Sequence, residues 1–366
     1  MVTSMWQRRE FLKAAMLGLG SLGLPALCWA QGEHQDAWLW SAIDDAQGHQ
    51  LLGYQPSTGN RFRVPVPERC HGGCRRPGQP QIALFSRRPG RLAHVLDGNE
   101  QREVTRITAG SDHHFYGHGA YSPDGRLLYA TANRIKDSAG VIRVFNAEND
   151  YALEGEIDLA GIGPHELRLL PDGQTLAVGL GGIRTHPDYG RVKLNLDDMA
   201  PALLLVDRLS GAILERHAPS HHQLSCRHLD VAPDGSVLAG YQFQGPAWER
   251  QPLLAFREPD GAFAEIALPD ELTDTLRHYI ASIAMAPDAP LALITAPRGH
   301  RVLLMDRNER RLIASHHLPD AAGALPDGNG GFWVSSGQGE IFRVPGDGSQ
   351  PQRLDALDLR WDNHLS

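Results

Sequence analysis

Cysteine is scarce in this chain: its 366 residues include only four. The three that follow the first 30 residues, Cys70, Cys74 and Cys226, are too few and too widely spaced for a disulfide framework. Cys70 and Cys74 can form one optional disulfide, or all three can be free thiols. The segment CHGGC also lacks the Cys-x-x-Cys-His order of covalent haem attachment, so we expect no attached haem.

Positive charge is also in the minority. Lys and Arg number 35 against 43 Asp and Glu, which gives a formal net charge of −8. Proteins that bind nucleic acid concentrate Lys and Arg on one surface, because contacts with the phosphate backbone dominate their affinity. We therefore expect no nucleic-acid partner.

Three familiar catalytic motifs are absent from the sequence. It contains no Gly-x-Ser-x-Gly elbow, no glycine-rich phosphate-binding loop and no His-Glu-x-x-His helix. Their absence favours a binding protein over an enzyme. It does not decide the question, because a fold can assemble acids and bases from segments that lie far apart in the sequence.

The first 30 residues have the pattern of an export signal. The paired Arg8 and Arg9 precede the letters FLK and an apolar stretch that ends at Ala30. This order is typical of a twin-arginine signal, and the apolar run is shorter than the roughly 20 residues that a membrane span needs. We predict a signal peptide over residues 1–30 and a periplasmic mature protein over residues 31–366, exported in its folded state and without a membrane span.

Turn signals recur along the rest of the chain at intervals of about 40 to 60 residues. A β-rich run follows each turn, for example TLAVGL and LALITA, and a second run ends in another turn. Four such runs per interval are typical of one blade of a β-propeller. The prolines of these turns are Pro77, Pro123, Pro171, Pro233, Pro287 and Pro326.

The two ends of the chain are predicted to share one blade. The N-terminal runs AWLWSAIDD, HQLLGYQPSTG and RFRVPVP make three strands without an innermost one, and the C-terminal LDLRWDNHLS supplies it. Joining both ends in one blade closes the ring and protects the open sheet edges. We therefore predict an all-β protein, a single seven-bladed β-propeller domain over residues 31–366, and a monomer.

Five histidines occupy the same place in the repeat, a few residues before the turn or its equivalent. The innermost strand of each blade lines the central channel, so these side chains are expected at the channel mouth. Imidazoles near carboxylates are ordinary ligands of zinc, copper and iron, which predicts a metal site, with iron or copper as the ion, or a site for an anion. Alternatively, each histidine hydrogen-bonds within its own blade. The five are His71, His118, His165, His228 and His364.

Charged residues accompany these histidines. Glu166 and Arg227 stand directly beside two of them in the sequence, and both are predicted to contact the ligand. Arg87, Arg88 and Arg298 are expected on the same face. Guanidinium groups can bind a carboxylate or a phosphate there, or they can hydrogen-bond within their own loops.

One connection is much longer than its equivalents. The segment GLGGIRTHPDYGRVKLNLDDMAP joins the second and third strands of the fourth blade. Long loops on a rigid scaffold tend to carry function, so we expect part of the ligand site here. The predicted ligand-binding residues of this loop are Thr185, His186, Arg191, Lys193 and Asn195.

Several of these segments resemble a known family. GIGPHELRLLPDG followed by GGIRTHPDYGRVKLNL, with FYGHGAYSPDGRLLYAT before and CRHLDVAPDG after, is similar to the bacterial family catalogued as domain of unknown function 1513. The resemblance covers nearly all of the mature chain. It implies a twin-arginine-exported propeller akin to YVTN and WD40-like repeats, and a periplasmic accessory of iron acquisition with an imelysin-like or di-haem partner. This chain departs from the family pattern at Leu180 and in CHGGC.

Three functional hypotheses follow. The first is a periplasmic propeller that binds a metal ion, iron or copper, or a metal-bound or anionic small ligand at the channel mouth. The second is a non-catalytic platform that docks an iron-uptake or haem protein. The third is a hydrolase or lyase that uses His165 or Glu166 on a small anionic substrate.

Overall fold

The structure is a computed structural model that describes residues 38–190 and 192–366. The predicted export signal and Arg191 lie outside the described residues. Strands dominate the described chain, and α2 (Asp270–Thr275), between β19 (Phe263–Ile266) and β20 (Ser282–Met285), is a single short helix turn. No helix among the described residues is long and apolar enough to cross a lipid bilayer.

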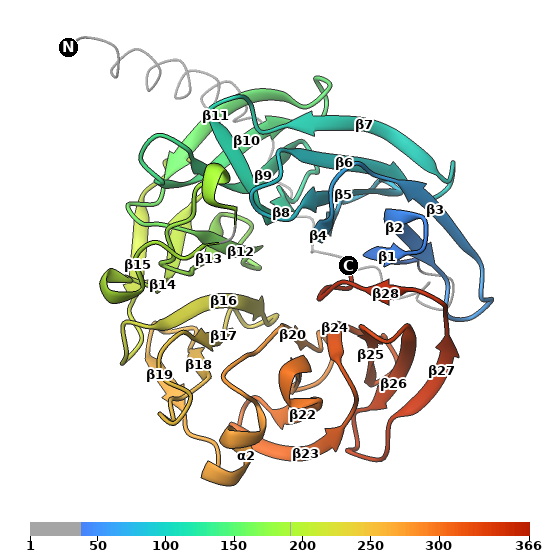
Figure 1. The fold of residues 1–366 in the computed structure, drawn as a ribbon, viewed down its shortest axis with the longest axis vertical. Helices are drawn as coiled ribbons and strands as arrows, with labels where there is room; N and C mark the ends of the chain where they lie inside the picture. The colour runs from blue at the N-terminus through green and yellow to red at the C-terminus, as the bar shows by residue number, and fades with distance from the viewer. Residues whose placement is uncertain (1–37, 191) are drawn as a thin grey trace, which may run out of the picture. The chain divides into compact units, whose positions relative to one another are not determined.

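Seven four-stranded antiparallel sheets form the seven blades of a β-propeller, as predicted (Figure 1). Strand order in each blade runs from the ring axis outward. Blade 1 contains β28 (Arg360–Trp361), β1 (Leu39–Asp45), β2 (Gly48–Tyr54) and β3 (Arg61–Pro65). Blade 2 contains β4 (Cys70–Arg75), β5 (Gln81–Ser86), β6 (Leu92–Asp97) and β7 (Arg102–Thr108). Blade 3 contains β8 (His113–Tyr121), β9 (Leu127–Arg134), β10 (Gly140–Asn146) and β11 (Ala152–Asp158).

The remaining four blades follow in chain order. Blade 4 contains β12 (Pro164–Leu169), β13 (Thr175–Leu180), β14 (Ala202–Asp207) and β15 (Ile213–His217). Blade 5 contains β16 (Leu224–Val231), β17 (Val237–Phe243), β18 (Leu254–Arg257) and β19. Blade 6 contains β20, β21 (Leu291–Ala296), β22 (Arg301–Asp306) and β23 (Arg311–His317). Blade 7 contains β24 (Ala321–Pro326), β25 (Gly331–Ser336), β26 (Glu340–Pro345) and β27 (Gln352–Ala356).

The C-terminal segment closes the ring, as the sequence predicts. Trp361 pairs with Ile43 of β1, and further along the backbone groups of Ser366 and Trp40 exchange two hydrogen bonds of 3.0 Å. The Trp361 indole packs edge-on against Tyr54, with ring centroids 6.2 Å apart. The segment that follows β28 therefore occupies the innermost position of blade 1.

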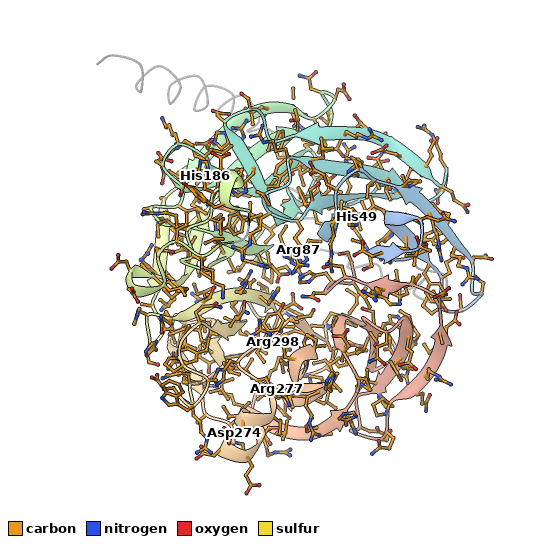
Figure 2. The ribbon with its side chains drawn as sticks, viewed as in Figure 1. His49, Arg87, His186, Asp274, Arg277 and Arg298 are labelled. Carbon is orange, nitrogen blue, oxygen red and sulfur yellow. The ribbon has the colours of Figure 1, made fainter. Side chains whose placement is uncertain are left out.

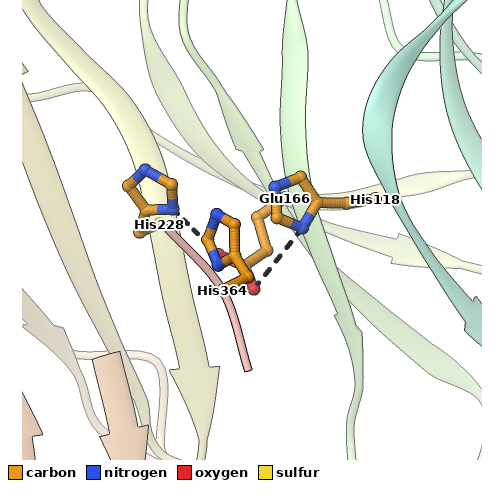
Figure 3. A group of neighbouring side chains, drawn as sticks. All are labelled: His118, Glu166, His228 and His364. Atoms are coloured by element: carbon orange, nitrogen blue, oxygen red, sulfur yellow. Dashed lines mark hydrogen bonds and ion pairs between the residues drawn. The ribbon is translucent and has the colours of Figure 1, made fainter. Parts of the chain in front are cut away.

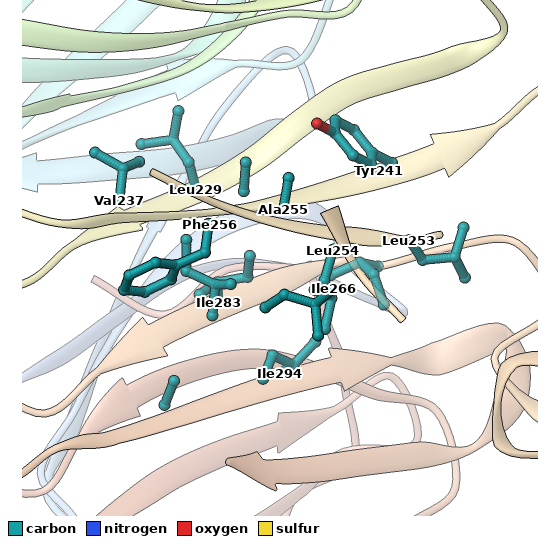
Figure 4. Packing of buried hydrophobic residues seen from close by; sticks show 14 of the residues in the cluster. Leu229, Val237, Tyr241, Leu253, Leu254, Ala255, Phe256, Ile266, Ile283 and Ile294 are labelled. Carbon is teal, nitrogen blue, oxygen red and sulfur yellow. The ribbon is translucent and has the colours of Figure 1, made fainter. Parts of the chain in front are cut away.

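Burial falls from the inner strands to the outer ones. All six residues of β13 are buried, because both faces of this strand pack against neighbouring blades, whereas most residues of β11 are exposed. The largest apolar cluster joins blades 4, 5 and 6, where Leu229, Phe256 and Ile283 are among the residues drawn in Figure 4. Apolar packing between adjacent blades thus holds the ring together.

The described cysteines are all free thiols. Cys70 and Cys74 lie on the single strand β4, where Cys70 packs between blades 1 and 2 and Cys74 borders the cluster between blades 2 and 3. Cys226 is buried in the cluster of blades 4 to 6. Of the two alternatives that the sequence left open, this structure has the thiols.

The long connection predicted in blade 4 spans residues 181–201, between β13 and β14, and we call it the blade 4 loop. Two short 3₁₀ turns, η2 (Pro187–Tyr189) and η3 (Leu196–Asp198), order it, and a third, η4 (Pro297–Gly299), lies in blade 6. His186 caps η2, since its Nδ1 accepts a hydrogen bond of 3.2 Å from the backbone N–H of Asp188.

Candidate metal centre

The five predicted histidines come together at the ring axis. Ring centroids of neighbouring pairs lie between 4.4 Å, for His71 and His364, and 5.1 Å, for His118 and His165. His228 lies 4.7 Å from His165 and 4.9 Å from His364. All five rings are buried. Side chains from five different blades therefore form one cluster, which we call the histidine cluster.

Irregular pairing in the inner strands places these side chains. The register between the first and second strands of blades 2 to 5 shifts at or beside each histidine, for example between Cys70 and Gly73 and between Phe115 and Gly119. Such bulges leave residues unpaired and re-aim their side chains. Register shifts thus turn the histidines of adjacent blades toward the axis.

Glycine makes the close approach of two of these blades feasible. A Cβ atom on Gly72 would lie 2.5 Å from Nδ1 of His118, and one on Gly117 would lie 2.9 Å from Cδ2 of His71. Gly117 also has a positive φ of 106°, which other residues rarely adopt. Each glycine therefore provides the space for the imidazole of the neighbouring blade.

Two buried carboxylates orient the imidazoles. Asp362 Oδ1 lies 2.5 Å from Nδ1 of His71, and Glu166 Oε2 lies 3.3 Å from Nδ1 of His228. The other oxygen of Glu166 lies 3.8 Å from Nδ1 of His118, and Figure 3 shows the two contacts of Glu166. Each of these contacts joins residues of different blades, so hydrogen bonding within one blade does not account for them.

Guanidinium groups pair with both carboxylates. Arg168 Nη2 lies 2.8 Å from Glu166, and Arg69 donates a hydrogen bond of 2.8 Å to Asp362. Burial acts to raise the pKa of Asp362, but His71 and the nearby arginines outweigh it and hold this pKa well below its usual value. Asp362 is therefore an acceptor for the Nδ1–H of a neutral His71.

Burial lowers the pKa of every histidine in the cluster, because charging an imidazole there would cost solvation. The other imidazoles and Arg227 add to this effect at His165 and His228. The rings are therefore neutral near pH 7. Neutral imidazole is the form that ligates metal ions.

Four nitrogen atoms of the cluster have no hydrogen-bond partner within residues 38–190 and 192–366. They are Nε2 of His118, His228 and His364, and Nδ1 of His165. Buried polar atoms of proteins are normally satisfied, so each of these atoms requires an explanation. Unpartnered imidazole nitrogens gathered in one buried cluster suit a metal ion, so the donor atoms present fit such a site.

Two overlapping groups can each surround one ion. The first contains His71, His118 and His165, and the second contains His118, Glu166, His228 and His364. Within each group the donor atoms lie within 4.8 Å of one another. His118 belongs to both groups.

An arginine cluster borders the histidines. Arg227 lies in the register shift of β16 beside His228, and its Nη1 donates a hydrogen bond of 2.5 Å to Gln242 Oε1. Arg87 and Arg88 directly follow the last residue of β5, which pairs with the first residue of β4. Both therefore lie at the same end of blade 2 as the start of its inner strand, and Figure 2 labels Arg87 near the ring axis. Burial, with Arg88 close by, lowers the pKa of Arg227 to about 9. At neutral pH the guanidinium is still charged.

The predicted residues of the blade 4 loop have other contacts. Asn195 bonds the backbone of Arg184 and Gly182 and so fastens the loop to itself, and Lys193 Nζ reaches Gln244 Oε1 of blade 5 at 2.5 Å. Thr185 is buried, with its hydroxyl 3.3 Å from that of Tyr116. As described, these three order the loop and do not belong to either group of metal-binding candidates.

Sequence reasoning missed some residues around the cluster. Arg168 follows Glu166 by two positions, and the period of a strand places such residues on one face, so this spacing was a usable signal. Tyr116 and Tyr279 face His165 and His228 at ring distances of 6.4 and 6.3 Å, and nothing in the sequence singled out either tyrosine as a neighbour of the cluster.

The sequence matches the model of the family described as "Protein of unknown function (DUF1513)" over residues 64–366. The chain belongs to this family. None of the curated proteins matches it. Membership agrees with the motifs that carry the histidines, all five of which lie within the matched residues.

Solved structures share the fold at low sequence identity. Hydrazine synthase of Kuenenia stuttgartiensis is 19% identical, with a TM-score of 0.61 over 79% of this chain and 87% of that chain. Sqt1 of Saccharomyces cerevisiae is 15% identical, with a TM-score of 0.52 over 80% of this chain and 86% of that chain. At these identities the likeness extends to the propeller fold alone.

Proposed function

We propose that this protein of the DUF1513 family is a periplasmic metal-binding propeller that takes part in iron acquisition. The observation that carries the metal site is the set of four unpartnered nitrogen atoms on neutral imidazoles, converging from different blades in a buried cluster. Glu166 and Asp362 would orient the rings through Nδ1, as carboxylates do for many metal-ligating histidines. Periplasmic location and the link to iron rest on the export-signal pattern and the family motifs.

The proposed ions are iron and copper. Imidazole nitrogen with a carboxylate suits both, and nitrogen ligands bind Cu²⁺ more strongly than Fe²⁺ in the general order of affinities. Cys70 and Cys226 lie close in sequence to His71 and His228 but are packed in the apolar clusters between blades. The donor set is therefore imidazole and carboxylate, without thiolate.

Elemental analysis of the full chain, exported and also purified from the cytoplasm, tests this proposal. We expect about one or two equivalents of iron or copper, and loss of most of the metal in His118→Ala, since His118 belongs to both groups. His94→Ala is the matched control: His94 is equally buried but bonds Glu103 of its own blade at 2.6 Å. The proposal fails if the wild type takes up neither metal, or if His118→Ala retains it.

A docking platform for a haem or iron-uptake partner is the second candidate. Trp248 is 83% exposed in the β17–β18 loop, and Tyr189 and Val192 of the blade 4 loop are also exposed. Large exposed aromatic residues are enriched in protein interfaces. The test is co-purification of the protein with a haem protein from periplasmic extract. The role is supported if Trp248→Ala no longer recovers the haem protein while Leu354→Ala, on the outer strand β27, still does. Equal recovery with both variants would contradict it.

A further inference from the structure

Two buried guanidinium groups beside the histidine cluster have no carboxylate partner. Arg88 is 7% exposed and Arg227 is 8% exposed, and neither forms an ion pair with any described residue. Their hydrogen bonds go to neutral groups, Arg88 to the hydroxyl of Tyr116 at 3.3 Å and Arg227 to Gln242. Buried charges in proteins are normally paired, because removing an ion from water without a counter-charge is expensive.

Other cationic groups lie around these two. The charges of Arg88 and Arg87 both act on Arg227, and Arg298 stacks on Tyr279 with its guanidinium carbon 4.8 Å from the ring centroid. Among the residues that the structure describes, Arg87 pairs with one carboxylate, that of Asp362, at 3.7 Å. Positive charge therefore accumulates near the axis of a chain whose net charge is −8. Such a local field attracts small anions.

The surrounding groups are suited to an oxyanion. A guanidinium presents N–H donors in a planar fork that matches the oxygens of a carboxylate or phosphate. Tyr116 and Tyr279 border the same space: Arg88 lies 5.3 Å over the ring of the first, and the second accepts a hydrogen bond of 2.8 Å from Asn363. Both tyrosines also face histidines of the cluster.

We propose that Arg88 and Arg227, from blades 2 and 5, bind a small oxyanion, a carboxylate or a phosphate, directly beside the histidine cluster. The subsite goes beyond the metal site, because the two guanidiniums can hold the anion whether or not a metal is bound. An anion placed there would neutralise the buried charges of the two guanidinium groups beside the histidine cluster.

Calorimetric titration of the metal-free full chain tests this subsite, with malonate, citrate and inorganic phosphate as probes at constant ionic strength. We expect saturable binding of at least one probe, and the probe that binds distinguishes a carboxylate site from a phosphate site. Arg227→Gln and Arg88→Gln should each weaken it by about 10-fold or more, as for other charged hydrogen bonds. Arg250→Gln is the control, since Arg250 lies on the same face but is paired with Asp270 and Asp274.

Thermal unfolding separates this role from a structural one. Without anion, Arg227→Gln should melt at the same temperature as the wild type or higher, because a buried unpaired charge has been removed, and added anion should no longer stabilise it. If Arg227→Gln does not fold, Arg88→Gln in another blade decides. The proposal is overturned if none of the three probes binds saturably to the wild type, or if both arginine variants bind the probe as tightly as the wild type does. Neither result depends on the metal analysis.

Discussion

The imidazole of His71 and the carboxylate of Asp362 lie 2.5 Å apart, although 291 positions separate them in the sequence. This contact joins the inner strand of blade 2 to the segment that closes blade 1. Because the carboxylate is charged and buried, it fixes His71 with the proton on Nδ1 and leaves Nε2 as the ligating atom.

Asp362→Asn should therefore weaken metal binding by about 10- to 100-fold, as loss of an orienting carboxylate does at other metal sites. Competition titration with a chromogenic chelator measures this change. Asp44→Asn is the matched control, because Asp44 also lies 2.5 Å from a histidine, His49, but at the surface. An unchanged affinity in Asp362→Asn would show that this contact serves the fold and not the metal.

Trp361 is predicted to hold the ring closed. Its indole is buried against Tyr54 in the cluster between blades 7 and 1, so Trp361→Ala should lower the free energy of unfolding by about 3 to 5 kcal/mol. Chemical denaturation followed by circular dichroism measures the loss. The exposed Trp248, changed to Ala in parallel, should alter stability by about 0.5 kcal/mol or less. Similar losses in both variants would contradict the closure.

Acid should destabilise the protein through His114. Burial lowers the pKa of this residue to about 4, against about 6.5 in the unfolded chain. The unfolded state thus binds more protons between these values, and the associated stability, about 3 kcal/mol, is lost as the pH falls from about 6.5 to about 4. His114→Phe, which keeps a ring beside Tyr116, should flatten this part of the stability curve measured by urea unfolding. A variant as acid-sensitive as the wild type would refute the assignment.

The thiols should be inert in the native protein. Burial raises the pKa of Cys70 and Cys226 to about 12, and burial raises that of Cys74 as well. Since the thiolate is the reacting species, alkylation by iodoacetamide at pH 8 should be slow until the chain is unfolded in guanidinium chloride. Mass spectrometry after timed quenching counts the modified residues. Rapid modification of Cys70 or Cys226 in the folded state would contradict their placement.

Much of the fold could be predicted from the sequence because the same pattern of strands and turns repeats along the chain. Runs such as TLAVGL became the fully buried second strand of a blade, and the Pro-Asp-Gly turns set the spacing of the sheets. The closing role of β28 also followed, because three N-terminal strands without an innermost partner required one. Each of these inferences used a local pattern and a count.

The histidine cluster was only partly predictable. Shared positions in the repeat indicated that His71, His118, His165 and His228 would lie at the same level, but a slip of one residue in a strand turns a side chain to the other face. The deciding features are the register shifts and the glycines that accompany them, which carry no clear signal in one sequence. The lack of an ion pair at Arg88 could not be predicted either, because it depends on which carboxylates of the other blades lie near this side chain.

The four unpartnered imidazole nitrogens also link ion binding at the ring axis to the stability of the folded protein. Each buried acceptor without a partner costs about 1 to 3 kcal/mol, and a cation held by His118, His228 and His364 would remove that cost in blades 1, 3 and 5 at once. Because a ligand of the folded state alone stabilises it by mass action, the melting temperature becomes a measure of how fully the centre is occupied. A substitution that weakens the contacts between blades should then also lower the affinity for the ion, because folding and ion binding are thermodynamically linked.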